Sequence, residues 1–168
     1  MRKNLFYLSL IIALISTGCT KDDGAVRRNI LIDAVPQPKI AKNGGSTNIS
    51  MANLAGFAGK FDVKLLYPND IKPLKMDVVI RKNANNTNIK VYQAGVKVFP
   101  TSFTLTAADI VTLFGTAIVA GDTYDIGVDI YTLSGNKYEA FPVVGVAYGN
   151  TGVANQPGFS VTIRYTAG

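Results

Sequence analysis

Three aspartates lie close together in the second half of the chain and could act as a chemical group. Asp125 and Asp129 are four residues apart in an alternating stretch, and Asp122 lies just before them. Paired carboxylates suit glycoside hydrolysis or calcium binding. On a strand, however, positions four apart are separated by about 13 Å, whereas glycosidase pairs are separated by about 5 to 9.5 Å. The alternation predicts instead that these acids occupy the solvent-exposed face of an amphipathic strand.

A second group of side chains suits a sugar ligand. Residues 140–163 carry no charge, and a glycine-rich loop is expected over residues 145–158. The candidate ligand residues are Tyr148, Asn150, Asn155, Gln156 and Phe159. Their aromatic faces and amides could contact a carbohydrate. The alternative, which we favour, is an ordered turn whose aromatic side chains close one end of the domain, because long loops are functional only in some cases.

Composition excludes several function classes. The 168 residues contain no histidine, no tryptophan and one cysteine, which removes disulfides, zinc sites built on Cys or His, and nucleophiles activated by His. We therefore expect no catalytic residue, no metal and no enzymatic activity. The lysines and arginines are scattered rather than clustered, which argues against a nucleic-acid partner. Several basic residues on the expected strands predict a solvated sheet face. They are Lys60, Lys64, Lys72, Lys75, Arg81 and Lys82.

The N-terminus has the pattern of an exported protein. Arg2 and Lys3 precede an apolar run over residues 5–15, and small residues then lead to Cys19. This is a secretory signal peptide, and its apolar run is about half the roughly 20 residues that a membrane span needs. Ser-Thr-Gly-Cys resembles the lipobox of bacterial lipoproteins, which implies cleavage after residue 18 and a diacylglycerol and N-acyl lipid on Cys19. Two or more acyl chains hold a protein stably on a membrane.

The residues after the cysteine form a polar tether over 19–29. Lys21, Asp22 and Asp23 resemble the export signal by which lipoproteins of Bacteroidota reach the cell surface. The alternative is a polar linker that keeps the domain away from the lipid. The resemblance implies an outer-membrane protein at the cell surface, anchored by lipid.

The rest of the chain, residues 30–168, reads as one domain of short strands separated by turn residues. The expected strands cover residues 30–32, 47–51, 61–67, 74–80, 89–93, 96–105, 123–132, 137–144 and 159–165. One short helix is expected, with Thr106 as N-cap, Asp109 completing a capping box and Gly115 as C-terminal stop. This spacing predicts an all-β fold, an immunoglobulin-like β-sandwich of about eight or nine strands with one helix.

Residues 61–165 resemble small Bacteroidota surface lipoproteins found with glycan-uptake machinery, the starch-utilisation accessory lipoproteins E and F in the broad sense. The resemblance rests on residues 75–83, Ala94-Gly95-Val96, Phe99-Pro100, 106–115 and the stretch from Phe141-Pro142 through 154–158. That family implies an immunoglobulin-like domain that spaces sugar-binding domains from the membrane. Here one domain is expected without a tryptophan platform, which favours a spacer or assembly role.

The sequence therefore predicts a non-enzymatic, lipid-anchored accessory or interaction module of the outer membrane within a glycan-uptake system. Its expected partners are the membrane, through the lipid, and an outer-membrane transporter complex or a glycan. Two alternatives stay open: a carbohydrate-binding lipoprotein that uses loop 145–158, and the anchor or a subunit of a surface filament.

Overall fold

The computed structural model describes residues 35–143 and 161–168, all of which belong to one compact unit, Asp33–Gly168. The expected signal peptide, the tether and the strand over 30–32 lie outside the described residues, so they stay predictions. Within the described ranges the chain is mostly β-structure, with one short α-helix.

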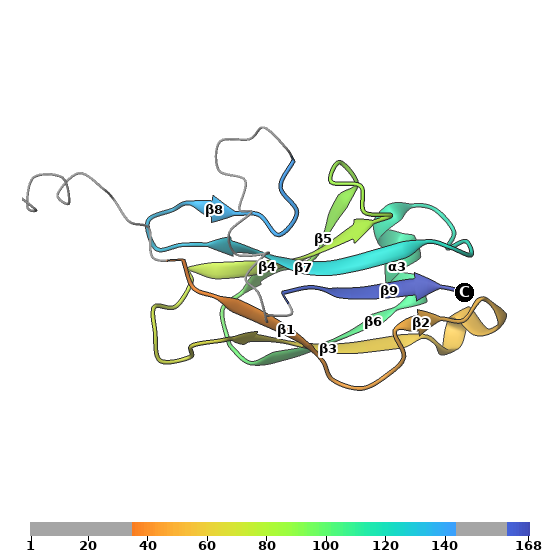
Figure 1. Ribbon diagram of the computed structural model, residues 1–168, viewed down its shortest axis with the longest axis horizontal. Helices are drawn as coiled ribbons and strands as arrows, with labels where there is room; N and C mark the ends of the chain where they lie inside the picture. Colours follow the sequence, from red (N-terminus) through yellow and green to blue (C-terminus); the bar gives the residue numbers. More distant parts are fainter. Residues whose placement is uncertain (1–34, 144–160) are drawn as a thin grey trace, which may run out of the picture. The chain divides into compact units, whose positions relative to one another are not determined.

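The strands form two sheets, and the domain is sandwich-like (Figure 1). The strands are β1 (Pro38–Lys42), β2 (Asn48–Ile49), β3 (Ala58–Leu65), β4 (Lys75–Lys82), β5 (Ile89–Val96), β6 (Thr101–Thr106), β7 (Thr123–Tyr131), β8 (Lys137–Tyr138) and β9 (Ile163–Ala167). One sheet has the order β1-β3-β6 and the other β2-β9-β7-β4-β5, with β8 also paired to β7. All pairs are antiparallel except β2 and β9, which are parallel.

The hydrophobic core lies between the two sheets and follows the alternation of the sequence. Phe61 and Val63 of β3 are fully buried, while their neighbours Lys60 and Lys64 point away from the core. The other sheet contributes the buried side chains Met76, Val78, Ile80, Tyr124, Ile126, Val128, Ile130 and Tyr165. Apolar area removed from water on both sheets is the main source of stability for such a domain.

The short helix is confirmed at the predicted position. It is α3 (Ala107–Phe114), and Thr106 is its N-cap. The Thr106 hydroxyl accepts a hydrogen bond from the Asp109 N–H at 3.2 Å, and the Asp109 carboxylate accepts one from the Thr106 N–H at 2.9 Å. Gly115 ends the helix with φ of 65°, a left-handed conformation that glycine adopts without strain. Ile110 anchors the helix in the core.

Two elements at the start of the domain were not predicted. No strand was predicted between residues 33 and 46, but Pro38 begins β1, an edge strand paired only with β3 among the described strands. An edge strand tolerates proline because one side of its backbone needs no partner. The strand expected over 47–51 is reduced to β2, because Ser50 begins the 3-10 helix η1 (Met51–Gly56).

Candidate functional site

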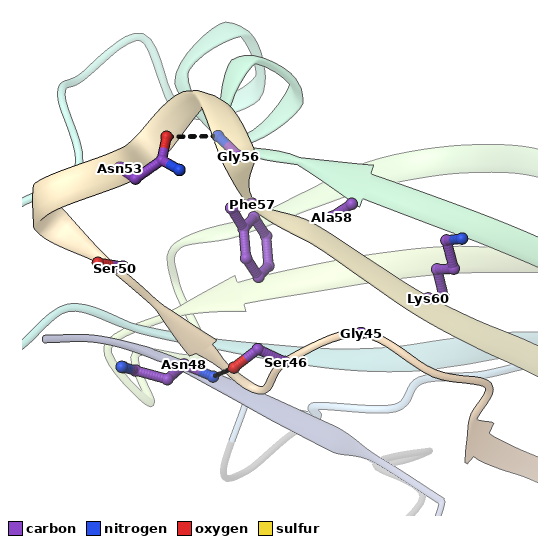
Figure 2. A pocket seen from close by; sticks show the side chains of 9 residues that line it. All are labelled: Gly45, Ser46, Asn48, Ser50, Asn53, Gly56, Phe57, Ala58 and Lys60. Atoms are coloured by element: carbon purple, nitrogen blue, oxygen red, sulfur yellow. Dashed lines mark hydrogen bonds between the residues drawn. The ribbon is translucent and has the colours of Figure 1, made fainter.

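A polar hollow with a distinct lining lies beside η1 and forms a groove (Figure 2). It encloses about 540 Å³. Its lining residues are Gly45, Ser46, Asn48, Ser50, Asn53, Gly56, Phe57, Ala58 and Lys60. They come from the β1–β2 turn, from β2, from η1 and from the start of β3, which meet at the end of the domain that carries Gly168 (Figure 1).

Local hydrogen bonds fix the shape of this groove. The backbone N–H of Asn48 donates to the Ser46 hydroxyl at 2.9 Å. The side-chain oxygen of Asn53 accepts from the Gly56 N–H at 3.0 Å, the bond drawn in Figure 2. Gly45 has φ of 70°, and a Cβ there would clash with the Ala58 carbonyl oxygen. Only glycine therefore lets the turn approach β3 so closely.

The groove offers hydrogen-bond donors and one positive charge. With its oxygen held by Gly56, the Asn53 side chain presents its NH₂ as a donor. Ser50 is the N-cap of η1, but its hydroxyl makes no capping bond. Lys60 carries the only charge among the lining residues, and it is exposed on β3. This lining suits a hydroxyl-rich ligand that is neutral or negatively charged.

Phe57 gives the groove an apolar wall. Its side chain is buried, with 6% exposed. The ring packs edge-on against Tyr165, with a centroid distance of 5.5 Å and an interplanar angle of 79°. A ring held in this way is rigid, so it fixes the inner wall of the groove.

The carboxylates lie elsewhere, on and beside β4 and β7 of the six-stranded sheet, and the prediction that they are solvent-exposed was wrong. Asp122, Asp125 and Asp129 are 4%, 3% and 6% exposed, and Asp77 of β4 is equally buried. The physical reason is that each acid has a cationic partner on the same face. Such ion pairs allow β4 and β7 to be buried on both faces.

Asp125 lies at the centre of this buried charge network. Arg81 donates to its carboxylate from Nη2 at 2.7 Å, and Arg164 donates from Nε at 2.6 Å. The Arg81 guanidinium also lies over the ring of Phe141, 4.2 Å from the centroid. A Cβ on Gly127 would come within 2.9 Å of that ring, so glycine makes room for this cover. The Phe141 ring therefore covers the Arg81 side of the network.

Two acids of the network face each other across neighbouring strands. Asp77 of β4 is the direct partner of Asp129 of β7. Lys75 binds Asp77 at 3.1 Å, and Lys137 binds Asp129 at 2.9 Å. The N–H of Gly95 donates to Asp77 at 2.7 Å. Two lysines and a backbone donor therefore offset the repulsion between the two carboxylates.

This arrangement does not suit acid–base catalysis. Burial by itself raises the pKa of Asp77, but the Gly95 N–H and the Lys75 ammonium outweigh it, so this pKa lies below its ordinary value. Burial likewise opposes ionisation of Asp125, and its bonds to Arg164 and Arg81 again leave the pKa lowered. A general acid of a glycosidase needs a raised pKa. The network is therefore a structural feature of the sheet.

Asp122 forms a separate cluster at the start of β7. It accepts a hydrogen bond from Asn83 at 2.9 Å, pairs with Lys82 at 2.9 Å, and accepts from the Tyr124 hydroxyl at 3.0 Å. Burial opposes its ionisation, yet these partners lower the pKa of Asp122 to about 2. The cluster joins the β4–β5 loop to the start of β7.

The basic series predicted to be a solvated face divides into two groups. Lys60 and Lys72 are exposed, as expected, and the partly exposed Lys64 pairs with Asp62 at 3.0 Å. Lys75, Arg81 and Lys82 are partly buried and paired with the acids described above, so for them the prediction was wrong. Lys75 pairs with Asp77 of its own strand, but alternation along β4 could not reveal that β7 carries Asp125 opposite Arg81.

The other predicted site residues lie outside the described residues. They are the lipidation site Cys19, the export signal Lys21, Asp22 and Asp23, and the loop residues Tyr148, Asn150, Asn155, Gln156 and Phe159. Within residues 35–143 and 161–168, no group of three His, Cys, Asp or Glu side chains could hold a metal ion. In these same ranges no helix combines the length and the hydropathy of a membrane span.

Comparisons with protein-family models, with curated proteins and with solved structures found no match for this chain.

Sequence reasoning did not find the groove. Its residues all lie between residues 45 and 60, where the sequence predicted only the strand over 47–51. The one usable signal is the density of Ser and Asn between residues 46 and 53, which favours hydrogen bonds between side chains and backbone. That signal is shared by ordinary loops.

Proposed function

We propose that this protein is a non-enzymatic, lipid-anchored interaction module of the outer membrane, exposed at the cell surface and accessory to glycan uptake. The anchor rests on the basic pair, the short apolar run and the small residues before Cys19. The surface position rests on Lys21, Asp22 and Asp23.

The observation that carries the interaction role is the groove beside η1. Hydroxyl and amide groups, one lysine and a rigid aromatic ring line it, and these are the groups that bind hydroxyl-rich ligands. The ligand class that fits is a glycan, neutral or with an acidic group that Lys60 would pair. Loop 145–158 stays the alternative ligand site.

We also propose that the sandwich has an immunoglobulin-like topology. The strand order β9-β7-β4-β5 supports this, because variable-type immunoglobulin domains order their strands G-F-C-C′ in the corresponding sheet. The order β1-β3-β6 of the other sheet is likewise compatible with strands A, B and E. An experimental structure with a different order of the central strands would contradict this assignment.

The anchor is tested by protease treatment of intact cells that make the wild-type chain, Cys19→Ala or Asp22→Ala/Asp23→Ala. We expect the wild-type protein to be membrane-bound and digested, because lipid holds it on the outer face. Cys19→Ala should leave the membrane fraction, and the double variant should stay membrane-bound but become protected. A Cys19→Ala protein that remains membrane-bound contradicts the lipid anchor, and a protected wild-type protein contradicts the surface position.

The groove is tested by Lys60→Ala and Asn53→Ala on a glycan array, followed by titration of each glycan that binds. We expect each variant to weaken binding by roughly tenfold, because one hydrogen bond to a charged or polar group is lost. Lys90→Ala is the matched control, since Lys90 is exposed on β5 in the other sheet. If Tyr148→Ala abolishes binding and the groove variants do not, the ligand site is loop 145–158.

A further inference from the structure

The end of the domain opposite the groove carries a group of exposed apolar side chains. Its members are Tyr67, Ile71, Leu74, Val98 and Leu133, each between 50% and 73% exposed. They come from the β3–β4, β5–β6 and β7–β8 connections, which lie at the same end of the domain in Figure 1. We refer to these five residues as the apolar tip.

Two hollows and one hydrogen bond join the connections that carry the apolar tip. A hollow of about 600 Å³ joins Val35 and Pro36 to Ile71 of the β3–β4 connection. A second hollow, of about 280 Å³, joins Lys72 of that connection to Val98 of the next. The remaining side is closed by a backbone hydrogen bond of 2.8 Å from the Leu74 N–H to the Tyr131 carbonyl.

The charges of this surface fit a lipid–water boundary. Lys72 and Lys97 line the second hollow, and both are exposed. Asp70 is the acid of the same connections, so the cations outnumber it. Lysine can bury its aliphatic stem in apolar material while its ammonium group stays at the polar headgroups. Tyrosine is likewise favoured at membrane interfaces, where its ring is apolar and its hydroxyl is wet.

We infer that the apolar tip docks onto the surface of the lipid bilayer, an inference that rests on the lipid anchor proposed above. Val35, where the described chain begins, lines a hollow of this same surface. Fifteen residues lie between it and Cys19, so the two Cα atoms can be at most about 55 Å apart. An acyl anchor therefore keeps the apolar tip at a high effective concentration beside the bilayer, where even weak surface binding is populated.

Docking of the apolar tip on the bilayer determines which way the groove beside η1 faces. The groove residues and the apolar tip lie at opposite ends of the described domain (Figure 1). With the tip in the headgroup region, the groove faces away from the membrane and towards ligands in the medium. The orientation comes from the folded domain, whereas the lipid supplies only proximity.

The absence of tryptophan from the chain permits a direct test with single tryptophan reporters. Val98→Trp and Leu133→Trp place a reporter in the apolar tip, at positions 73% and 70% exposed. Val119→Trp is the matched control, because Val119 is 55% exposed in the α3–β7 connection at the groove end (Figure 1). The acylated full chains are reconstituted into phosphatidylethanolamine–phosphatidylglycerol vesicles with and without brominated acyl chains.

Docking predicts that vesicles shift the emission of both tip reporters to the blue. Brominated lipid should quench them at least roughly twofold more than the Val119→Trp control, because interfacial side chains lie at the depth of the upper acyl chain. Equal quenching of all three reporters in membrane-bound protein overturns the inference. A blue-shifted tip reporter without vesicles also overturns it: dependence on protein concentration then identifies a second copy as the occupant, and independence identifies another segment of the chain.

A second preparation separates this inference from the anchor. The same reporters are placed in a full chain with Cys19→Ala, held on nickel-chelating lipids by an N-terminal hexahistidine tag. If the chain lacks acylation in cells but its tip reporters are quenched here, the proposed anchor fails and docking stands. If acylation is found but the reporters stay unquenched in both preparations, docking fails and the anchor stands. Equal urea midpoints of the reporter variants show that each has folded.

Discussion

Replacing Asp125 with alanine is expected to lower the free energy of unfolding by about 3 kcal/mol. The substitution removes the carboxylate that holds Arg81 and Arg164, and it leaves the Arg81 guanidinium partly buried without its anion. Loss of one partner from a buried ion pair costs more than the pair contributes, because the remaining charge is desolvated. We place the value at the low end of the usual range because the Arg164 side chain is 55% exposed. Urea denaturation at pH 7 measures it.

Two variants make this prediction specific. Asp125→Asn keeps the shape and part of the hydrogen bonding, so its loss should be smaller than that of Asp125→Ala. Asp70→Asn removes an exposed acid of the β3–β4 connection and should change stability by less than about 0.5 kcal/mol. An Asp125→Ala protein as stable as Asp70→Asn would show that the network contributes nothing to folding.

Acid is expected to destabilise the domain strongly between about pH 5 and pH 2. The pKa values of Asp77, Asp122 and Asp125 are lower in the folded protein than their ordinary value. Folding therefore favours the ionised forms, so this stability is complete above the ordinary pKa and is lost as the pH falls through the folded one. For Asp122, whose pKa falls from 3.8 to about 2, the contribution is about 2 kcal/mol.

Unfolding by urea at pH 7, 5, 4 and 3 measures this loss. Asp122→Asn is the informative variant, because it removes one titrating group and should reduce the difference in unfolding free energy between pH 7 and pH 3. With no histidine in the chain, we expect little change between pH 6 and pH 8. A wild-type stability that stays constant down to pH 3 would contradict the depressed pKa values.

The parts of the fold that were predictable from sequence are those that local interactions determine. Helix α3 follows from Thr106, Asp109 and Gly115, whose caps act within a few residues. Strands β3, β4 and β7 follow from alternation and turn residues. Edge strand β1 was missed because a proline can either end a strand or begin an edge strand, and the neighbouring residues do not distinguish the two cases.

The charge network could not be predicted because it depends on register between distant strands. The sequence shows Asp77 between Lys75 and Arg81, a pattern that also fits a solvated face. Only pairing of β4 with β7 places Arg81 opposite Asp125 and Asp77 opposite Asp129. The polar groove is formed locally, within residues 45–60, but the density of Ser and Asn in that stretch does not distinguish a groove from an ordinary loop. The lipidation, export and loop residues stay predictions.

Two strands, β8 and β9, share one edge of β7. This arrangement determines which part of the domain can vary without changing the sheet. Thr123–Ile126 pairs with β9 and Ile130–Tyr131 pairs with β8, so both strands lie on the same edge of β7. The chain thus leaves the sheet and returns to it at neighbouring positions, each held by its own backbone bonds. The end of β8 at Tyr138 and the start of β9 at Ile163 are therefore two fixed points beside one strand. The length or chemistry of the sequence between these two strands can be changed while the strand order persists, as recognition loops vary on an antibody framework.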